Sequence, residues 1–238
     1  MANVSDIWNL VGLRYKSHPW HGVHIGDNAP EIVTAFIEAT PSDTVKYEVD
    51  KQTGYLKVDR PQKYSNVLPA LYGFIPQTYC AESVADYCME KSGRTGIIGD
   101  GDPIDICVFT EKNITHGDIL VQAVPIGGFR MIDGGEADDK LIAVLKGDEV
   151  YKNWRDVSDC PVTMIDRLKH YFLTYKDMPG SESSRCEIVQ IYGRDEALEV
   201  IERSRRDYIA KFGKLENKLS IAAMEAFALG FNMKKLPL

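Results

Sequence analysis

One short run of the sequence, Gly99–Ile106, gathers the side chains with the clearest capacity for chemistry. It places three carboxylates, Asp100, Asp102 and Asp105, within six residues. Carboxylates this close repel one another, so keeping all three ionised requires a cation nearby. In a regular strand Asp105 would face away from the other two, because side chains alternate between faces. The Gly and the Pro between them disfavour a regular strand, and we expect a bent segment on which the three carboxylates converge.

The ligand chemistry of this run narrows the choice of cation. Oxygen ligands without histidine or cysteine favour Mg²⁺, Mn²⁺ or Ca²⁺ over zinc. A calcium-binding EF-hand loop would need Gly at its sixth position, where this chain has Asp105, and helices on both sides. The flanking residues have strand patterns instead, which excludes the EF-hand. An exposed acidic turn without a ligand is the simpler alternative for an Asp-Gly-Asp run on its own.

A second acidic group lies between Gly127-Gly128 and Leu141 and ends in Lys140. Its members are Asp133, Glu136, Asp138 and Asp139. The whole chain carries 35 acidic and 28 basic residues, a net charge of −7. The segment from Gly99 to Lys140 alone contributes −6, with nine acidic and three basic residues. Two acidic groups within one small β domain favour a site for several metal ions over an acidic turn.

The composition excludes several classes of protein. With 238 residues, 44% hydrophobic and 26% charged, the chain is typical of a soluble globular protein. Its net negative charge disfavours nucleic-acid binding, because that affinity rests on Lys and Arg neutralising phosphates. No run approaches the ~18 apolar residues of a membrane span, and residues 1–20 show no secretory signal. The five cysteines lack CxxC spacing and are typical of free thiols, so we expect a cytoplasmic protein without nucleic-acid or membrane partners.

The elements that must position these groups are mostly short strands. Strand-like runs separated by turn residues cover 33–38, 45–50, 55–60, 104–109, 119–125 and 141–145. The second and third runs alternate apolar and charged residues, and Thr53-Gly54 predicts a hairpin between them. That hairpin would bring Lys46 and Glu48 close to Arg60. Many short strands at close spacing are typical of a small barrel or sandwich.

The last third of the chain changes to a helical period. One helix is predicted after Asp159, its N-cap, and is expected to end near residues 178–180. Its apolar stripe consists of Ile165, Leu168, Phe172 and Tyr175. A second helix is predicted over about 195–212 with Gly213 as its C-cap, and residues 214–238 could hold a third. Without a repeat or linker, we predict one domain over 1–238, with a catalytic core of about 33–178 and a helical extension of about 194–238.

Several motifs occur in an order that resembles one protein family. They are Lys46-Tyr47-Glu48, Val58-Asp59-Arg60, Tyr72-Gly73, the run from Asp100 to Ile106, Asp133 through Lys140, and Tyr175-Lys176. Each is weak alone. The ordered set, from about Glu38 to Lys176, resembles the soluble family I inorganic pyrophosphatases, and most closely their chlamydial-type bacterial members.

The resemblance implies both a fold and an activity. The fold would be α+β and mainly β, a five-stranded OB-like closed barrel with helices packed on it and a helical C-terminal tail. The activity would be hydrolysis of diphosphate to two phosphates with several Mg²⁺ ions per active site, or Mn²⁺ in their place. The partners would be pyrophosphate, phosphate and further copies of the chain, as a dimer or hexamer.

The same resemblance assigns roles to individual residues. The metal ligands would be Glu48, Asp100, Asp105, Asp133 and Asp138, with Glu38 in or just outside the coordination shell. The substrate-binding residues would be Lys46, Arg60, Tyr72, Lys140, Tyr175 and Lys176. Arg suits bidentate contact with phosphate oxygens, while Lys acts as a point charge. Asp102 would take a proton from the attacking water, and Tyr72, the second catalytic residue, would donate to the phosphate near the attack.

Some features depart from the family pattern. Leu68 stands where many members have a tyrosine, residues 79–98 form an insertion relative to compact bacterial members, and the chain beyond about Phe212 is an extension. Asp139 matches no position of the motif around it, and we assign it no role.

Three histidines near the N-terminus, His18, His21 and His24, have a spacing that suggests zinc. Pro19 and Gly22 oppose a helix that would present them together, so a loop or interface role is expected instead.

Two other functions are compatible with a small acidic barrel. The chain could bind oligonucleotides or metals without catalysis, since fold alone does not fix function, or it could release phosphate from nucleotides. The acidic charge and the lack of an aromatic and basic surface pattern oppose the first. Comparing phosphate release from pyrophosphate, ATP and a monoester would separate the second.

Overall fold

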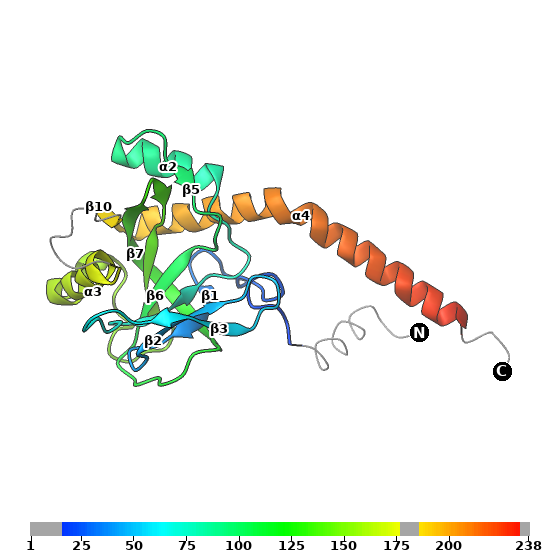
Figure 1. The fold of residues 1–238 in the computed structure, drawn as a ribbon, viewed down its shortest axis with the longest axis horizontal. Coiled ribbons are helices and arrows are strands. Elements are labelled where there is room, and N and C mark those ends of the chain that lie inside the picture. The colour runs from blue at the N-terminus through cyan, green and yellow to red at the C-terminus, as the bar shows by residue number, and fades with distance from the viewer. Residues whose placement is uncertain (1–15, 177–185, 234–238) are drawn as a thin grey trace.

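Five strands pair side by side into a closed ring that forms the body of the protein (Figure 1). The computed structural model describes residues 16–176 and 186–233. The ring runs in the order β1 (Val33–Ala39), β4 (Leu71–Phe74), β6 (Asp105–Phe109), β9 (Lys140–Leu145) and β7 (Ile119–Asp133), and β7 pairs back onto β1. β6 and β9 run parallel, and the other neighbours in the ring are antiparallel. This mainly β ring, with helices packed against it, confirms the predicted OB-like fold.

Most residues of the ring strands are apolar and buried because both faces of these strands are covered over much of their length. In β6 the four residues after Asp105 are all buried. Ile106 and Val108 belong to a cluster that also contains side chains of β1 and the long C-terminal helix, whereas Cys107 and Phe109 pack in a second cluster with the helix that follows β9. Such strands read as continuous apolar runs rather than as alternating ones.

Further strands extend this framework. β2 (Val45–Val49) and β3 (Leu56–Pro61) form the predicted hairpin. β10 (Cys186–Gly193) pairs along β7. The two-residue strand β8 (Glu136–Ala137) also pairs with β7, and β5 (Ile98–Gly99) pairs with β8. β7 is 15 residues long and pairs with β1, β9, β10 and β8. It therefore continues well past its predicted end at residue 125, and β10 is a strand that the sequence did not predict.

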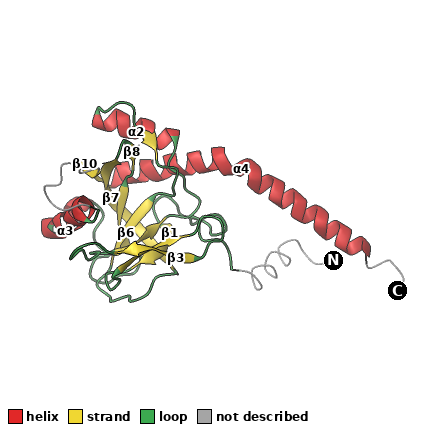
Figure 2. Cartoon of the chain, in the orientation of Figure 1, coloured by secondary structure: helices red, strands yellow, loops and turns green. Residues whose placement is uncertain are grey.

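Within the described residues, three helices pack on the strands: α2 (Glu82–Ser92), α3 (Val162–Thr174) and α4 (Arg194–Met233) (Figure 2). α3 lies where the apolar stripe predicts it, but it ends at Thr174, with Tyr175 as its C-cap, rather than near residues 178–180. α4 is one helix of 40 residues that runs along the body and then extends away from it (Figure 1). The described helices include none that is both long and apolar enough to cross a membrane.

The start of α3 corrects one prediction. Asp159 does not cap this helix, because its carboxylate accepts hydrogen bonds from the backbone N–H groups of Arg155 (2.7 Å) and Asp156 (3.0 Å). These bonds close a short 3₁₀ turn upstream of α3. Pro161 occupies the cap position of α3 instead, and no side chain caps the helix there.

Gly213 corrects a second prediction. It does not end a helix but lies inside α4, so the second and third predicted helices are one continuous element. A glycine in a helix interior costs about 1 kcal/mol relative to alanine. Good helix formers such as Lys211 and Leu215 stand on both sides of it, which is enough for the helix to continue.

The insertion at residues 79–98 contains α2, and the N-terminus of α2 is capped by a side chain from another element. Its own N-cap residue, Ala81, offers no side-chain acceptor. The buried carboxylate of Asp207 on α4 accepts hydrogen bonds from the backbone N–H groups of Ala81 (3.0 Å), Ser83 (3.1 Å) and Val84 (3.3 Å). One side chain of α4 therefore holds the start of α2 in place.

Replacing Asp207 by alanine is expected to lower the free energy of unfolding by about 2 kcal/mol, because three backbone donors lose a charged acceptor. Urea unfolding followed by circular dichroism measures this loss. Glu202→Ala, which removes a partly exposed carboxylate from the same helix, is the matched control and should change stability by less than about 0.5 kcal/mol. Equal losses in the two variants would contradict the capping role.

Candidate active site

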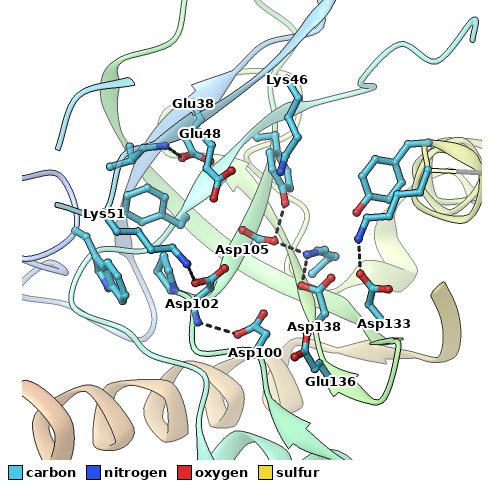
Figure 3. A pocket seen from close by; sticks show the side chains of 18 of the residues that line it. Glu38, Lys46, Glu48, Lys51, Asp100, Asp102, Asp105, Asp133, Glu136 and Asp138 are labelled. Carbon is cyan, nitrogen blue, oxygen red and sulfur yellow. Dashed lines mark hydrogen bonds and ion pairs between the residues drawn. The ribbon is translucent and has the colours of Figure 1, made fainter. Parts of the chain in front are cut away.

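A cavity of about 210 Å³ collects the residues that the sequence singles out (Figure 3). All thirteen predicted site residues line it: Glu38, Lys46, Glu48, Arg60, Tyr72, Asp100, Asp102, Asp105, Asp133, Asp138, Lys140, Tyr175 and Lys176. They come from β1, the β2–β3 hairpin, β4, the segment before β6, the edge formed by β7, β8 and β9, and the residues after α3. Segments far apart in the sequence thus meet at one place, while the role of each residue stays a prediction.

The hairpin supplies basic groups and a carboxylate to this cavity. Lys46 and Arg60 are direct partners across the hairpin, as its predicted turn requires. The register shifts beside Lys46, and the carboxylate of Asp59 lies 3.2 Å from the Lys46 Nζ. Glu48 follows two residues later on the same strand. The guanidinium of Arg60 lies 5.8 Å from the centre of the Tyr175 ring, which brings the hairpin close to the end of α3.

The segment from Asp100 to Asp105 is bent, as the Gly and Pro within it predict. Gly101 has a φ of 74°, which glycine adopts without strain. The backbone N–H of Asp102 donates to the Asp100 carboxylate at 2.9 Å, and Asp105 is the first residue of β6. All three carboxylates reach the cavity, which a straight strand would not allow.

The edge of β7, β8 and β9 presents its charged groups by simple alternation. The pairing of Asp133 with Glu136 and of Phe129 with Lys140 belongs to one antiparallel register. Because side chains alternate between faces, Asp133, Glu136, Asp138 and Lys140 share a face. All four line the cavity.

Lysine ammonium groups lie among the carboxylates. Lys140 is buried and forms ion pairs with both Asp105 and Asp138. Lys176 forms an ion pair with Asp133. The charges of these carboxylates are therefore balanced by lysines of the chain itself.

Two more contacts complete this network. The hydroxyl of Tyr72 donates a hydrogen bond to Asp105 at 2.6 Å. Lys51, in the turn of the hairpin, forms an ion pair with Asp102. Over residues 16–176 and 186–233, no three carboxylate, histidine or cysteine side chains stand together in an arrangement that would hold one metal ion. The carboxylates share a cavity rather than a single ready coordination centre.

Burial makes ionisation costly for several of these carboxyl groups. It raises the pKa of Glu38 to about 8 and that of Asp100 to about 9, with the nearby Asp138 adding to the rise at Asp100. Burial also raises the pKa of Asp138 to about 6, although Lys140 opposes the rise. Burial also acts to raise the pKa of Asp133, but the ion pair with Lys176 outweighs it, so the pKa of Asp133 is lowered.

These groups fit divalent cations. The described lining residues offer carboxylate oxygens and neither histidine nor cysteine, which suits Mg²⁺ or Mn²⁺ better than zinc. A divalent cation would relieve the cost of ionising several buried carboxylates in one cavity. Lysine, arginine and tyrosine side chains, which also line this cavity, are suited to binding phosphate oxygens.

Six residues of the lining were not predicted, and three of them carry polar groups: Trp20, Lys51 and Glu136. Glu136 belongs to the second acidic group, and its even spacing from Asp138 and Lys140 is a signal for a shared face. Lys51 stands in a turn, where a lysine is ordinary, and Trp20 lies far in sequence from every motif of the family pattern. Only the tertiary structure brings these two to the cavity.

The three N-terminal histidines have separate surroundings. His21 stacks on Trp20 with 4.5 Å between ring centroids, and its Nδ1 lies 3.0 Å from the hydroxyl of Tyr208 on α4. The ring of His18 is 5.0 Å from that of His21, whereas His24 is exposed. This placement agrees with a loop role rather than with a joint zinc site.

His21 is expected to make the protein less stable in acid. Its burial, and next the nearby His18, lower the pKa of His21 from 6.5 to about 4. The unfolded chain therefore binds the proton at higher pH than the folded chain. The stability that His21 contributes is complete above about pH 6.5 and is lost as the pH falls toward 4.

His21→Phe keeps the stacked ring and removes the titration. Urea unfolding at about pH 7 and about pH 4.5 should show a smaller difference in the free energy of unfolding for this variant than for the wild type. His24→Phe, at the exposed histidine, is the control. A wild-type pH dependence in His21→Phe would contradict the assignment.

Comparisons with known proteins agree with this geometry. The model of the inorganic pyrophosphatase family matches residues 35–209. An inorganic pyrophosphatase from Chlamydia caviae is 55% identical over 199 residues, which cover 82% of this chain and 92% of that protein. Soluble inorganic pyrophosphatase 1 of Arabidopsis thaliana is 36% identical, with 79% of this chain and 78% of that protein covered.

Solved structures give the same answer. The crystal structure of the inorganic pyrophosphatase from Thermus thermophilus superposes with a TM-score of 0.67 at 28% identity, covering 81% of this chain and 98% of that one. The enzyme from Helicobacter pylori superposes with a TM-score of 0.64 at 28% identity, covering 78% and 98%. On its sequence and its fold alike, the chain belongs to the inorganic pyrophosphatase family and is a diphosphatase of the hydrolase class.

Proposed function

We propose that this chain hydrolyses inorganic pyrophosphate to two phosphates in the cavity described above, with Mg²⁺ as its cofactor. The observation that carries the proposal is the meeting of many carboxylates with a set of lysines, an arginine and tyrosines in one cavity. Carboxylates alone would repel a pyrophosphate anion, and basic groups alone would not explain so many acids. Together they suit an anionic substrate that binds with divalent cations.

Glu48, Asp100, Asp105, Asp133 and Asp138 would hold the cations, with Glu38 at the edge of the set. Bound divalent cations neutralise phosphate charge and lower the pKa of water. Glu38 is engaged with the protein as well, because its carboxylate accepts a hydrogen bond from the backbone N–H of Val49 at 2.7 Å. This bond fixes Glu38 beside the hairpin and supports an outer position for it.

The phosphate groups would contact the basic side chains of the cavity. Lys46 and Arg60 approach from the hairpin, Lys140 from β9, and Tyr175 with Lys176 from the end of α3. These groups stabilise negative charge as the bridging P–O bond breaks and the leaving phosphate departs. Because they come from separate elements, they hold both phosphate groups in one orientation.

Two side chains would act at the reacting phosphorus. Asp102 takes a proton from the water whose oxygen forms the new P–O bond. Lys51 forms an ion pair with the same carboxylate. Tyr72, whose hydroxyl donates to Asp105, can turn that hydroxyl to a phosphate oxygen instead. No residue of the chain needs to form a covalent bond with the substrate.

A phosphate-release assay tests this proposal directly. With Mg²⁺, the purified chain should release phosphate rapidly from pyrophosphate, and much more slowly from ATP or a phosphomonoester. EDTA should abolish the release, and added Mg²⁺ should restore it. Equal rates on ATP would favour a nucleotide phosphohydrolase, and no release from any substrate would favour a binding module.

The proposal extends to the setting of the enzyme. We propose that it works in the cytoplasm, as one domain over residues 1–238, and as a homo-oligomer, either a dimer or a hexamer. Light scattering coupled to size-exclusion chromatography measures the number of copies.

A further inference from the structure

A fully buried arginine lies behind the cavity and has no part in the proposed reaction. The side chain of Arg130 on β7 has no exposed surface. Its guanidinium lies between two aromatic rings, 5.2 Å from the centre of Tyr87 on α2 and 4.8 Å from that of Tyr192 on β10. It also donates hydrogen bonds to Gln190 and to Glu196, the latter at 3.1 Å. Arg130 therefore connects β7 with α2, β10 and α4.

The same guanidinium faces a buried carboxylate, that of Asp139. The Nε of Arg130 is 4.0 Å from Oδ2 of Asp139, and the hydroxyl of Tyr192 donates to this oxygen at 2.9 Å. Asp139 is almost fully buried, although no motif assigned it a role. Burying two charged groups is costly, and it is tolerated where they face each other and have polar partners. Arg130 and Asp139 thus face each other as a buried pair without a direct hydrogen bond, and Nε and Nη2 of Arg130 and Oδ1 of Asp139 have no hydrogen-bond partner among the described residues.

The strand register explains why this pair bears on the active site. Phe129 pairs with Lys140 and Ile132 with Ala137, so by continuity Arg130 stands opposite Asp139. Directly opposite residues share a face, and their neighbours along each strand lie on the other face. Arg130 and Asp139 therefore point away from the cavity, while the residues on either side of Asp139 point into it.

The pair also lies close to the tip of the edge, where the chain turns from β7 into β8. The turn between β7 and β8 consists of Gly134 and Gly135, both with positive φ and both with open space where a Cβ would stand. β8 itself is two residues long. β8 pairs with β7 on one side and with β5 on the other, and the ion pair between Arg130 and Asp139 adds a side-chain contact next to this short strand.

We propose that Arg130 and Asp139 are positioning residues, which hold the β7–β8–β9 edge in the register that turns Asp133, Asp138 and Lys140 into the cavity. The inference rests on the proposed function, because it concerns how strongly these groups hold a divalent cation. Neither residue touches the cavity, so each acts through the backbone of its neighbours. A loss of the pair would let the edge relax and weaken cation binding without removing any ligand.

Mn²⁺ binding to the full-length protein, measured by the electron paramagnetic resonance signal of the free ion, tests the proposal without relying on turnover. Asp139→Asn and Arg130→Met are expected to weaken Mn²⁺ binding by about tenfold, the lower end of what loss of a supporting partner costs a metal site. The turnover number for pyrophosphate should fall in parallel at a fixed Mg²⁺ concentration. Arg130→Lys, which keeps the positive charge, should recover part of the affinity.

Either single variant leaves one buried charge without its partner and could fail to fold. The double variant Arg130→Met with Asp139→Asn removes both charges, so it should fold while still lacking the pair. Val84→Ala in α2 is the control, because it removes buried apolar atoms from the neighbouring core and leaves the pair intact. It should lose stability and keep wild-type Mn²⁺ affinity.

The outcomes are distinguishable. Folded single and double variants that bind Mn²⁺ as tightly as the wild type would overturn the positioning role alone. A wild-type protein that binds no Mn²⁺ at millimolar concentration would overturn the proposed function and this inference with it. A weakening of the same size in Val84→Ala would show that any loss of stability suffices, which also overturns the inference.

Discussion

Asp105→Asn is expected to lower the turnover number for pyrophosphate by at least two to three orders of magnitude, about 3–4 kcal/mol of activation free energy. Asp105 occupies the centre of the charged network, where Lys140 and the Tyr72 hydroxyl both contact its carboxylate. Asparagine has nearly the same shape but no charge, so it cannot balance Lys140 or a cation. Asp102→Asn should have an effect of similar size, because the proposed proton acceptor is lost.

Steady-state phosphate release at saturating Mg²⁺ measures these losses, and circular dichroism shows whether the variants are folded. Asp118→Asn makes the same chemical change at an acidic residue outside the cavity, where Asp118 forms an exposed ion pair with Lys16. Asparagine also tolerates the positive φ of 59° at this position. Asp118→Asn should therefore keep its activity. Near-normal turnover by both Asp102→Asn and Asp105→Asn would contradict the proposed function.

Gly73→Ala is expected to destabilise the fold by about 3 kcal/mol, the upper end of the cost of overpacking. A Cβ at Gly73 would lie 1.8 Å from the carbonyl oxygen of Phe36 and 2.9 Å from the Cα of Ile37. Both are backbone atoms of β1, which pairs with β4 in the closed ring, so neither can move away without breaking strand pairing. The effect is steric and does not depend on an unusual φ at Gly73.

Urea unfolding of the variant against the wild type measures this cost. Gly213→Ala is the matched control, because its Cβ would meet only one side-chain atom, of Ile209, at 3.4 Å. Alanine is also favoured over glycine inside a helix by about 1 kcal/mol. Wild-type stability in Gly73→Ala would mean that β1 and β4 are farther apart than described. The Tyr72-Gly73 motif thus combines a site residue with a packing requirement.

Local sequence patterns predicted the elements in which each face keeps the same environment, either core or solvent, along the whole element. Alternating apolar and charged residues predicted the β2–β3 hairpin, and with it the pairing of Lys46 with Arg60. The 3.6-residue period predicted α3 to its correct face. The bend at Gly101 followed from glycine and proline chemistry. Each of these is decided by residues within a few positions of one another, which is why sequence alone suffices.

Local patterns failed where a residue far away in the sequence determines the local structure. β10 is mostly half-buried and lacks clear alternation, so only its pairing along β7 makes it a strand. The start of α2 has no local cap, because Asp207 on α4 supplies it. Gly213 is a normal helix stop by local rules, yet α4 continues through it. Asp159 is a residue type that commonly caps helices, but its carboxylate accepts a hydrogen bond from the backbone N–H of Arg155 instead.

The candidate site divides in the same way. The sequence by itself determined which side chains are available: two acidic groups with most of the net charge, and basic and aromatic residues in a family order. Residue type fixes ligand preference and charge, and these do not depend on the fold. Only the tertiary structure shows that the thirteen predicted site residues meet in one cavity, together with Lys51 and Trp20. It also shows that Asp139 is buried against Arg130. Burial and cross-strand pairing depend on residues that are far apart in the chain, so no local pattern can predict them.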